Sequence, residues 1–254
     1  MSSVTAAAPN SHWPYPRFIA HRGGGTLAPE NTLAGFREAR HFCFQGIETD
    51  VMLTADGAAV LSHDPVLGRV VKSSSPVASL TLKEIKTLDA GSLTAQKWAG
   101  ERIPTLEEAI ETCEANGLFM NIEIKPASES AAQATAQETV RIVRKLFAGK
   151  SLPLLSSFSR NALAAAAVEA PEIPRGLLLE GIPTDWKEVC MKLAVKTVHP
   201  DWQSVTPDFV EEAHTMGLGV MCYTVDSPDT ADALFTLGVD AVCTNRLDLF
   251  ANCR

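Results

Sequence analysis

The amino-acid sequence predicts an α/β fold, a single TIM-type (β/α)8 barrel, and three observations support this prediction. The chain has 254 residues, close to the roughly 200–250 residues that one such barrel occupies. Short apolar or β-branched runs alternate with longer segments of helical periodicity, as in parallel strands joined by crossover helices. Eight such runs occur, and none leads into the G-x-G-x-x-G turn of an open dinucleotide-binding sheet.

The expected strands and helices follow one another along the whole chain. The strands are expected at Phe18–His21, Ile47–Met52, Phe119–Ile124, Leu154–Ser157, Gly176–Leu179, Thr197–His199, Gly219–Tyr223 and Ala241–Thr244. The helices are expected at Thr32–Phe44, Thr105–Asn116, Ala131–Phe147, Asn161–Val168, Trp186–Ala194, Pro207–Met216 and Asp229–Leu237. Thr105 stands where a helix would be capped. Glycines typical of helix ends follow three of the helices, at Gly117, Gly217 and Gly238.

One hairpin interrupts this alternation after the second strand. Asp56-Gly57 separates two apolar runs that are too close in sequence for a parallel crossover, and this dipeptide favours a type I′ turn. With Asp56-Gly57 as the central pair of the turn, Ala55 faces Ala58 and Asp50 lies opposite His63. The hairpin is therefore expected to bring a carboxylate and an imidazole together.

A segment from about residue 65 to 104 follows the hairpin and is too long for an ordinary βα loop. Its polarity is mixed, with one short helix expected at Leu82–Leu88. We expect a small insertion over the barrel mouth without a core of its own. The barrel domain is expected to span residues 13–254, preceded by a loose tail over residues 1–12.

Composition and charge argue against several classes of protein. The hydrophobic share of 46% and the charged share of 20% are ordinary for a globular domain with a sizeable core. The net charge of −8, with scattered Lys and Arg, disfavours a nucleic-acid partner, so an anionic small-molecule substrate needs a local positive site. The sequence has no apolar run of about 18 residues, and we expect no stable membrane insertion.

The N-terminus and the cysteines predict a cytoplasmic location. Met1–Asn10 lacks the basic and apolar regions of a secretory signal. The six cysteines are widely spaced without a C-x-x-C pair, which indicates buried free thiols in a reducing compartment. The sequence leaves open whether the chain forms a homo-oligomer.

Acidic side chains gather near the ends of two neighbouring strands. Glu48 and Asp50 share one face of the second strand, and Glu123 and Lys125 share one face of the third. Taken alone, Glu123 with Lys125 and Glu48 with Arg22 would each also fit an ordinary ion pair at a barrel mouth, with no metal. Three converging carboxylates would repel one another, however, unless a hard cation held them. We therefore predict one divalent cation, Mg²⁺ or Ca²⁺ with Mn²⁺ as an alternative, on Glu48, Asp50 and Glu123.

Basic and imidazole side chains accompany these carboxylates. His21 and Arg22 end the first expected strand, and His63 lies on the hairpin. We expect Arg22 and Lys125 to hold a phosphate group. His21 and His63 are expected to act as general acid and base near neutral pH, because the sequence shows no Ser or Cys nucleophile system.

Weaker signals surround this constellation. Gly23-Gly24-Gly25 either offers backbone N–H groups to an anion or forms a flexible turn. Phe158 and Tyr223 end strands, where they either line the substrate pocket or form only an apolar rim. Glu30 and Asn31 are expected to brace Arg22 or to cap the first helix.

Eight motifs along the chain resemble those of glycerophosphodiester phosphodiesterases. They are Ala20-His21-Arg22-Gly23, Pro29-Glu30-Asn31-Thr32, Glu48-Thr49-Asp50-Val51, Asp56-Gly57, His63-Asp64, Asn121-Ile122-Glu123-Ile124-Lys125-Pro126, Ser156-Ser157-Phe158 and Tyr223-Thr224-Val225-Asp226. They occur in the family order, and the resemblance extends from Trp13 to the end of the chain. The opening Trp13-Pro14-Tyr15-Pro16-Arg17 is most similar to the cytoplasmic bacterial branch.

This resemblance implies metal-dependent hydrolysis of glycerophosphodiesters to sn-glycerol 3-phosphate and an alcohol. It implies that Glu48, Asp50 and Glu123 bind the metal. It also implies that His21 and His63 act as the acid/base pair and that Arg22 and Lys125 contact the phosphate. Three positions depart from the family pattern. Tyr223 and Asp226 stand where Trp and Asn are frequent, and Asn245 replaces a common Asp. These departures affect the expected pocket shape and alcohol preference.

Two other functions and two routes of attack remain open from the sequence. A lysophospholipase D-type phosphodiesterase would use the same site, but the chain shows no basic amphipathic helix for lipid binding. A catalytically inactive barrel that only binds phosphorylated ligands would lack a carboxylate or a histidine, and none is missing. Either water or the 2-hydroxyl of the substrate's glycerol would attack phosphorus.

Overall fold

Eight parallel strands close into a barrel in the computed structural model, which describes residues 12–251. The barrel strands are β1 (Phe18–Ala20), β2 (Gly46–Leu53), β4 (Phe119–Ile124), β5 (Leu154–Ser157), β6 (Arg175–Leu179), β7 (Thr197–Pro200), β8 (Gly219–Cys222) and β9 (Ala241–Thr244). β1 pairs with both β9 and β2, which closes the sheet. The predicted TIM-type barrel is confirmed, and every expected strand end lies within one residue of the observed end.

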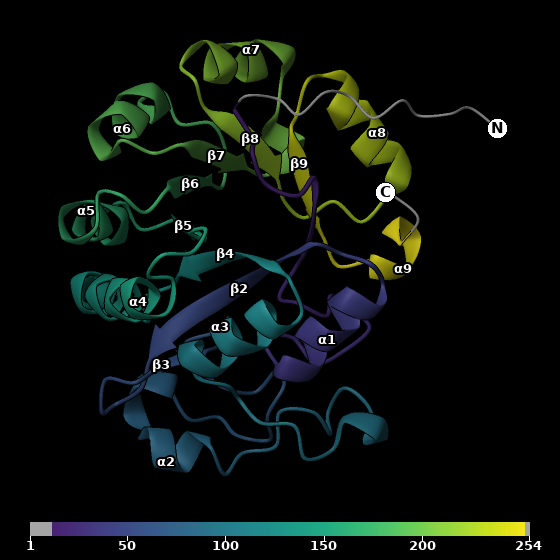
Figure 1. Cartoon of the computed structure of the whole chain (residues 1–254), viewed down its shortest axis with the longest axis vertical. Helices are drawn as coiled ribbons and strands as arrows, with labels where there is room; N and C mark the ends of the chain where they lie inside the picture. The colour runs from purple at the N-terminus through teal and green to yellow at the C-terminus, as the bar shows by residue number, and fades with distance from the viewer. Residues whose placement is uncertain (1–11, 252–254) are drawn as a thin grey trace.

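Helices surround the strands, as Figure 1 shows. They are α1 (Leu33–His41), α3 (Leu106–Ala115), α4 (Ala132–Leu146), α5 (Arg160–Glu169), α6 (Trp186–Leu193), α7 (Pro207–Thr215), α8 (Pro228–Thr236) and the short α9 (Leu247–Phe250). Thr105 caps α3 in a capping box with Glu108, as its position predicts. The glycines expected at helix ends all have positive φ angles, at Gly117, Gly217 and Gly238. α9 was not predicted, because one helical turn shows no periodicity.

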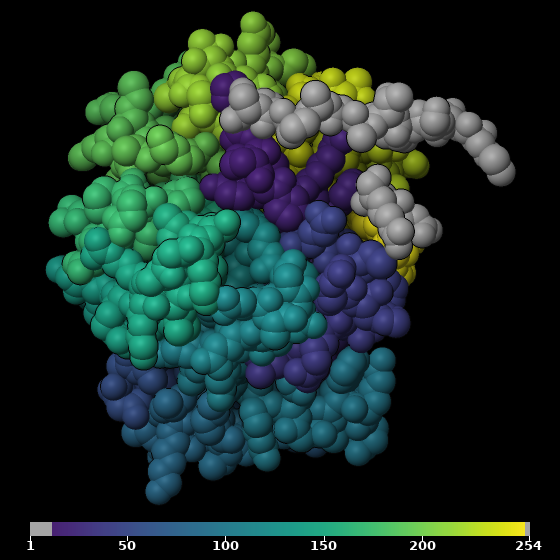
Figure 2. Space-filling view, in the orientation of Figure 1, coloured from purple at the N-terminus to yellow at the C-terminus, as the bar shows by residue number. Residues whose placement is uncertain are grey.

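Aromatic residues before β1 close one end of the barrel. Trp13 packs with barrel-interior side chains such as Ile19 and Met221. Tyr15 stacks on Phe119, the first residue of β4, with ring centroids 4.6 Å apart. Figure 2 shows this purple segment lying across the face in view. The barrel is thus closed at the N-terminal ends of its strands, and polar side chains are left to the opposite end.

The hairpin after β2 has a different register from the one expected. β3 (Ala59–Leu61) pairs antiparallel with β2, and Val51 faces Leu61. The loop has three residues rather than two, because the Thr54 N–H donates to the Ala58 carbonyl oxygen while Gly57 adopts a φ of 79°. The Ser62 N–H donates to the Asp50 carbonyl oxygen, so Ser62 rather than His63 lies opposite Asp50.

The segment after β3 builds a second apolar cluster, contrary to the expectation that it lacks a core of its own. Met52 and Val60 of the hairpin form this cluster with six side chains from the segment, Leu67, Val71, Val77, Ile85, Ala90 and Ile103. The segment contains α2 (Leu82–Ile85) and two 3-10 turns at Val77–Ser79 and Gln96–Trp98. Two more 3-10 turns lie outside it, at Glu129–Ala131 and Trp202–Ser204. Figure 1 shows the segment beside β3, against the barrel.

The chain ends and the cysteines follow the expectations in part. The expected tail lies outside the described residues except for His12, which stacks on His214 with ring centroids 5.5 Å apart. Cys43 is exposed just after α1, whereas the other four described cysteines are buried as expected, and Cys253 lies outside the described residues. None of the helices in residues 12–251 is both long enough and apolar enough to cross a membrane.

Candidate active site

A cavity of about 190 Å³ opens at the C-terminal ends of the barrel strands. Eight of the nine predicted site residues line it, namely His21, Arg22, Glu48, His63, Glu123, Lys125, Phe158 and Tyr223. The ninth, Asp50, is only 1% exposed and lies against the charged wall. Side chains from β1, β2, β4 and the hairpin therefore reach one place, as the parallel barrel requires of strand ends.

Three carboxylates converge at the base of this cavity. One oxygen each from Glu48, Asp50 and Glu123 lies within 4.8 Å of the others, and all three residues are buried. Asp50 and Glu123 are direct neighbours in the register of β2 and β4. Glu48 Oε1 is buried without a hydrogen-bond partner. Three buried carboxylate oxygens, one of them unsatisfied, fit a hard divalent cation such as Mg²⁺, Ca²⁺ or Mn²⁺.

The negative charges of these three carboxylates repel one another. Burial and repulsion from Asp50 raise the pKa of Glu123 to about 8, and the same two causes raise the pKa of Glu48 well above its ordinary value. Burial also raises the pKa of Asp50. The positive charges around it, that of Lys125 first, and a hydrogen bond from Asn31 nevertheless hold this pKa below the ordinary value. Asp50 is therefore the ionised member of the trio, and a bound cation would allow the other two to ionise.

Polar neighbours fix Asp50 from three sides. Asn31 Nδ2 donates to Asp50 Oδ2 over 2.7 Å, while Asn31 Oδ1 accepts from the Thr49 hydroxyl and the Asp50 N–H. Lys125 Nζ lies 3.1 Å from Asp50 Oδ1, and Arg22 Nε lies 3.9 Å from Asp50 Oδ2. Asn31 thus braces a carboxylate, and the cap of the first helix is the neighbouring Thr32.

Arg22 links the first strand to this network. Its φ of 52° is uncommon for a side chain other than glycine and aims its N–H at Glu48 Oε2, 2.9 Å away. Its guanidinium donates to Glu30 Oε2 over 2.9 Å, so Glu30 braces Arg22 as expected. The Arg22 side chain is 13% exposed, at the cavity wall. A phosphate group in the cavity would therefore meet a guanidinium that is already oriented.

His21 points one ring nitrogen at an amide and the other toward the carboxylates. Nδ1 lies 2.7 Å from Asn245 Oδ1, and Nε2 lies 3.8 Å from Glu48 Oε2. Burial, followed by repulsion from Arg22, lowers the pKa of His21 to about 4. His21 is therefore neutral near pH 7, with Nε2 available to accept a proton.

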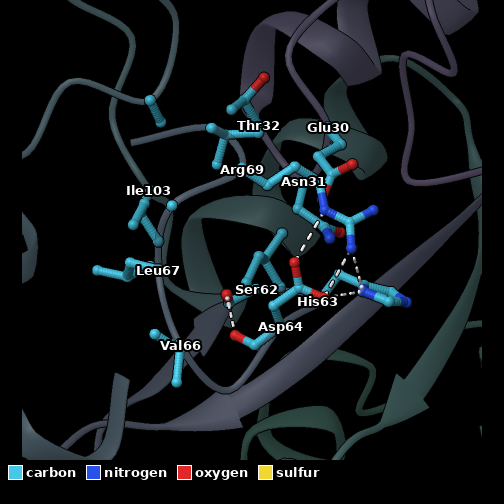
Figure 3. A pocket seen from close by; sticks show the side chains of 14 residues that line it. Glu30, Asn31, Thr32, Ser62, His63, Asp64, Val66, Leu67, Arg69 and Ile103 are labelled. Carbon is cyan, nitrogen blue, oxygen red and sulfur yellow. Dashed lines mark hydrogen bonds and ion pairs between the residues drawn. The ribbon is translucent and has the colours of Figure 1, made fainter. Parts of the chain in front are cut away.

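His63 has a carboxylate partner instead. Its Nδ1 lies 2.7 Å from Asp64 Oδ1, and Arg69 donates to both oxygens of Asp64. Arg69 also lies 3.7 Å from Glu30. Figure 3 shows His63, Asp64, Arg69 and Glu30 meeting beside a small pocket of about 20 Å³. The pKa of His63 is lowered overall, first by burial and then by the positive charges of Lys125 and Arg22, although the Asp50 and Asp64 carboxylates act in the opposite direction.

The glycine run after Arg22 forms a tight turn and is not an anion site. The N–H groups of Gly23, Gly24 and Gly25 donate to the carbonyl oxygens of Ala20, Arg22 and His21, respectively. A Cβ atom at Gly25 would lie 2.1 Å from the carbonyl oxygen of Asn245. Small residues are required here because β1 turns sharply against the end of β9. Of the two readings that the sequence allows, the structure supports the turn.

Phe158 and Tyr223 form the opposite, less charged wall of the cavity. Their rings meet edge to face with centroids 5.8 Å apart. The Tyr223 hydroxyl donates to the Leu179 carbonyl oxygen, so it is already occupied. The cavity is thus charged on one side and aromatic on the other.

Three residues that complete the histidine environments have no role in the sequence-based prediction. Asp64 directly follows His63, and Asn245 follows the last strand, so their positions carried a signal that the prediction did not use. Arg69 lies within the insertion. Nothing in its local sequence separates it from a solvated surface arginine.

Comparisons with known proteins agree with this geometry. The glycerophosphoryl diester phosphodiesterase family profile matches residues 21–249. The glycerophosphodiester phosphodiesterase of Caldanaerobacter subterraneus subsp. tengcongensis is 34% identical over 235 residues, 92% of this chain and 96% of that protein. A phosphodiesterase from Oleispira antarctica, solved with the product sn-glycerol-3-phosphate, is 34% identical with a TM-score of 0.89, covering 92% and 95% of the two chains. Glycerophosphodiester phosphodiesterase from Agrobacterium tumefaciens str. C58 is 27% identical with a TM-score of 0.78, covering 93% and 99%.

The raised pKa of Glu123 predicts how stability depends on pH when no cation is bound. Its pKa is about 8 in the folded chain against an ordinary 4.5. The stability that Glu123 contributes to the folded chain is therefore complete below its ordinary pKa, and it is lost as the pH rises through its pKa in the folded chain. The melting temperature in EDTA should fall between about pH 5 and about pH 9 by more in the wild type than in Glu123→Gln. The exposed Glu169→Gln should behave like the wild type, and equal losses in all three proteins would contradict the assignment.

Proposed function

Because the chain belongs to the glycerophosphoryl diester phosphodiesterase family, we propose that it hydrolyses glycerophosphodiesters to sn-glycerol 3-phosphate and an alcohol. The observation that carries this proposal is the buried trio of carboxylates facing a cavity that also holds two cationic side chains and two histidines. Hydrolysis of a phosphodiester requires that the negative charge of the phosphate be neutralised, that the attacking hydroxyl lose a proton and that the departing alcohol gain one. The cavity offers a side chain suited to each of these demands.

Glu48, Asp50 and Glu123 are the proposed ligands of one divalent cation. When bound, a hard cation would neutralise charge on the phosphoryl oxygens and polarise the phosphorus atom. Arg22 and Lys125 would donate to the phosphoryl oxygens from the same wall. Lys125 Nζ lies between Asp50 and Glu123, at 3.1 and 3.7 Å, so its charge is held close to the trio.

The two histidines have different partners, and this difference divides their roles. His21 is the proposed general base, because its Nε2 faces the trio and its low pKa keeps it neutral. His63 is the proposed general acid. The Asp64 carboxylate on its Nδ1 stabilises the protonated ring, and Arg69 holds Asp64 by two hydrogen bonds. His63 would donate its Nε2 proton to the departing alcohol.

The aromatic wall of Phe158 and Tyr223 is the proposed contact for the neutral part of the substrate. The charged wall would take the phosphate, so the phosphodiester would lie across the cavity between the two walls. A lysophospholipid would need further apolar surface for its acyl chain. The large apolar side chains that are exposed in residues 12–251 come from separate segments of the chain, at Val66, Leu93, Phe158, Val168, Met191, Leu237 and Leu249.

Activity is expected to require a divalent cation and to favour a small substrate. EDTA-treated protein should not release glycerol 3-phosphate from glycerophosphocholine, and one or more of Mg²⁺, Ca²⁺ and Mn²⁺ should restore release. Glu123→Gln should lower both the cation affinity and the restored rate, whereas the exposed Glu169→Gln should change neither. Lysophosphatidylcholine in a parallel assay should be a poorer substrate. Full activity in protein that is free of metal by elemental analysis would refute the cation requirement.

His63→Ala is expected to lower kcat by roughly 10²–10⁴, the range typical of a lost general acid or base. A substrate with p-nitrophenol as the leaving group needs little protonation, so it should recover most of the rate in His63→Ala but not in His21→Ala. The exposed His41→Ala serves as the control and should retain the wild-type rate. Equal recovery in the His21 and His63 variants would contradict the proposed division of roles.

The substrate's own glycerol is the proposed source of the attacking oxygen. Its 2-hydroxyl lies next to the phosphoester and has the effective-concentration advantage of an intramolecular group. His21 would take the proton of this hydroxyl while the hydroxyl oxygen forms a bond to phosphorus. The bond from phosphorus to the alcohol oxygen would break as His63 donates a proton. Water would then open the resulting cyclic phosphate, with the two proton roles reversed.

A 2-deoxy analogue tests this route. At saturation it should turn over far more slowly than the matched glycerophosphodiester, because it lacks the internal nucleophile. Quenched reactions of the normal substrate should contain a 1,2-cyclic phosphate, detected by phosphorus NMR. Equal turnover of the two substrates would instead assign the attack to water.

A further inference from the structure

We propose that Asp226 and Asn245 are positioning residues that hold His21 in one tautomer, with its proton on Nδ1 and its Nε2 free. This inference rests on the proposed function, in which His21 accepts a proton through Nε2. Neither residue is among the nine predicted site residues, and neither lines the cavity. Both act from the far side of the imidazole ring.

A chain of hydrogen bonds fixes the orientation of the Asn245 amide. Asn245 Nδ2 donates to Asp226 Oδ2 over 3.1 Å, and the Asn245 N–H donates to Asp226 Oδ1 over 2.7 Å. The Thr244 hydroxyl also donates to Asp226 Oδ1. An ionised carboxylate only accepts hydrogen bonds, so the NH2 group of Asn245 must face Asp226. The amide oxygen of Asn245 is therefore the atom that faces His21.

The orientation of the amide determines where the His21 proton lies. Asn245 Oδ1 only accepts hydrogen bonds and lies 2.7 Å from His21 Nδ1. A hydrogen bond at this distance requires the proton on Nδ1. The neutral ring then has a lone pair on Nε2, which lies 3.8 Å from Glu48 Oε2 on the cavity side. The carboxylate of Asp226 thus sets the proton position of His21 through an intervening amide.

The backbone around Asn245 keeps this chain in place. Its carbonyl oxygen accepts from the N–H of Thr26, at 2.9 Å, and from the Thr26 hydroxyl. Gly25 passes so close to the same oxygen that any Cβ would collide with it. Asn245 is consequently held at its N–H, its carbonyl and its side-chain amide. The turn that follows His21 thus also anchors the residue that orients the His21 ring.

Asp226→Asn should release this constraint. An amide at position 226 offers only one acceptor oxygen for the two Asn245 donors, so the Asn245 side chain could rotate and present its NH2 group to His21 Nδ1. The His21 proton would then move to Nε2, and the ring could no longer accept a proton from the substrate. The exchange Asp226→Asn with Asn245→Asp should restore the constraint, because the carboxylate at position 245 accepts directly from Nδ1 and from the amide at position 226.

The test combines NMR and kinetics on the Mg²⁺-loaded full chain. Long-range ¹H–¹⁵N spectra of ¹⁵N-histidine protein report which ring nitrogen carries the proton, and His21→Gln assigns the His21 signals. The wild type should show a protonated Nδ1. Asp226→Asn should show mixed tautomers, with kcat on glycerophosphocholine lowered about 10–100-fold and KM nearly unchanged. The double exchange should recover both the tautomer and most of kcat.

Controls separate this proposal from its alternatives. Asp248→Asn removes a nearby exposed carboxylate that pairs with Arg246 and should leave both readouts unchanged. Thermal melting must show that every variant is folded. A wild-type proton on Nε2, or an Asp226→Asn loss that the exchange does not reverse, would overturn the proposal. A wild type that is inactive on glycerophosphodiesters would instead refute the proposed function, while the spectra would still decide the tautomer.

Discussion

Burial of three carboxylates at one end of the barrel is the constraint on which the rest of this site depends. Removing one ion from water costs on the order of several kcal/mol, and a hydrogen bond to a charged group returns about 1.5–3 kcal/mol. Asp50 accepts such hydrogen bonds from Asn31 and Lys125. The charge of Arg22, 3.9 Å away, also favours its ionised form. Glu48 receives one N–H from Arg22, and its other oxygen has none. The deficit at Glu48 and Glu123 is what a bound cation would offset.

The insertion contributes to the same site through packing. Its apolar cluster uses the hairpin side chains Met52 and Val60, which a barrel strand alone would leave without partners. The packed segment carries Arg69 to Asp64, and Asp64 in turn contacts His63. Leu67, Ala90 and Ile103 of this cluster line the small pocket beside His63 and Asp64. The cluster thus helps to fix the orientation of one imidazole. The other imidazole is oriented from the end of β9, so the two histidines are set by separate parts of the chain.

The sequence predicts the strands and the charged wall well because both follow short-range rules. Alternation along a strand puts Glu48 and Asp50 on one face, and the parallel barrel brings Glu123 to the same end. The hairpin register was wrong by one residue because Asp-Gly also fits a three-residue loop, and the choice depends on contacts of Asp56 with the insertion. The residues that orient the two histidines were not predicted. Asp64 follows His63 and Asn245 follows the last strand, so their positions carried a signal that was not used. Arg69 reaches Asp64 from the insertion, and no local pattern encodes that contact.

The two polar departures from the family pattern acquire a physical meaning once their positions are known. Where the resemblance expects Asn and later Asp, this chain has Asp226 and later Asn245, and the two side chains are in contact. The pair therefore still contains one carboxylate and one amide, with their positions exchanged. Two carboxylates in contact would repel each other, and two amides would leave the orientation of each undetermined. An exchange at both positions avoids both outcomes. It leaves His21 hydrogen-bonded to the neutral amide oxygen of Asn245, while the negative charge lies on Asp226 behind that amide. The hydrogen bond to Asn245 raises the pKa of His21, but a neutral oxygen raises it less than a carboxylate in the same place would. This smaller effect suits the proposed role of His21 as the base.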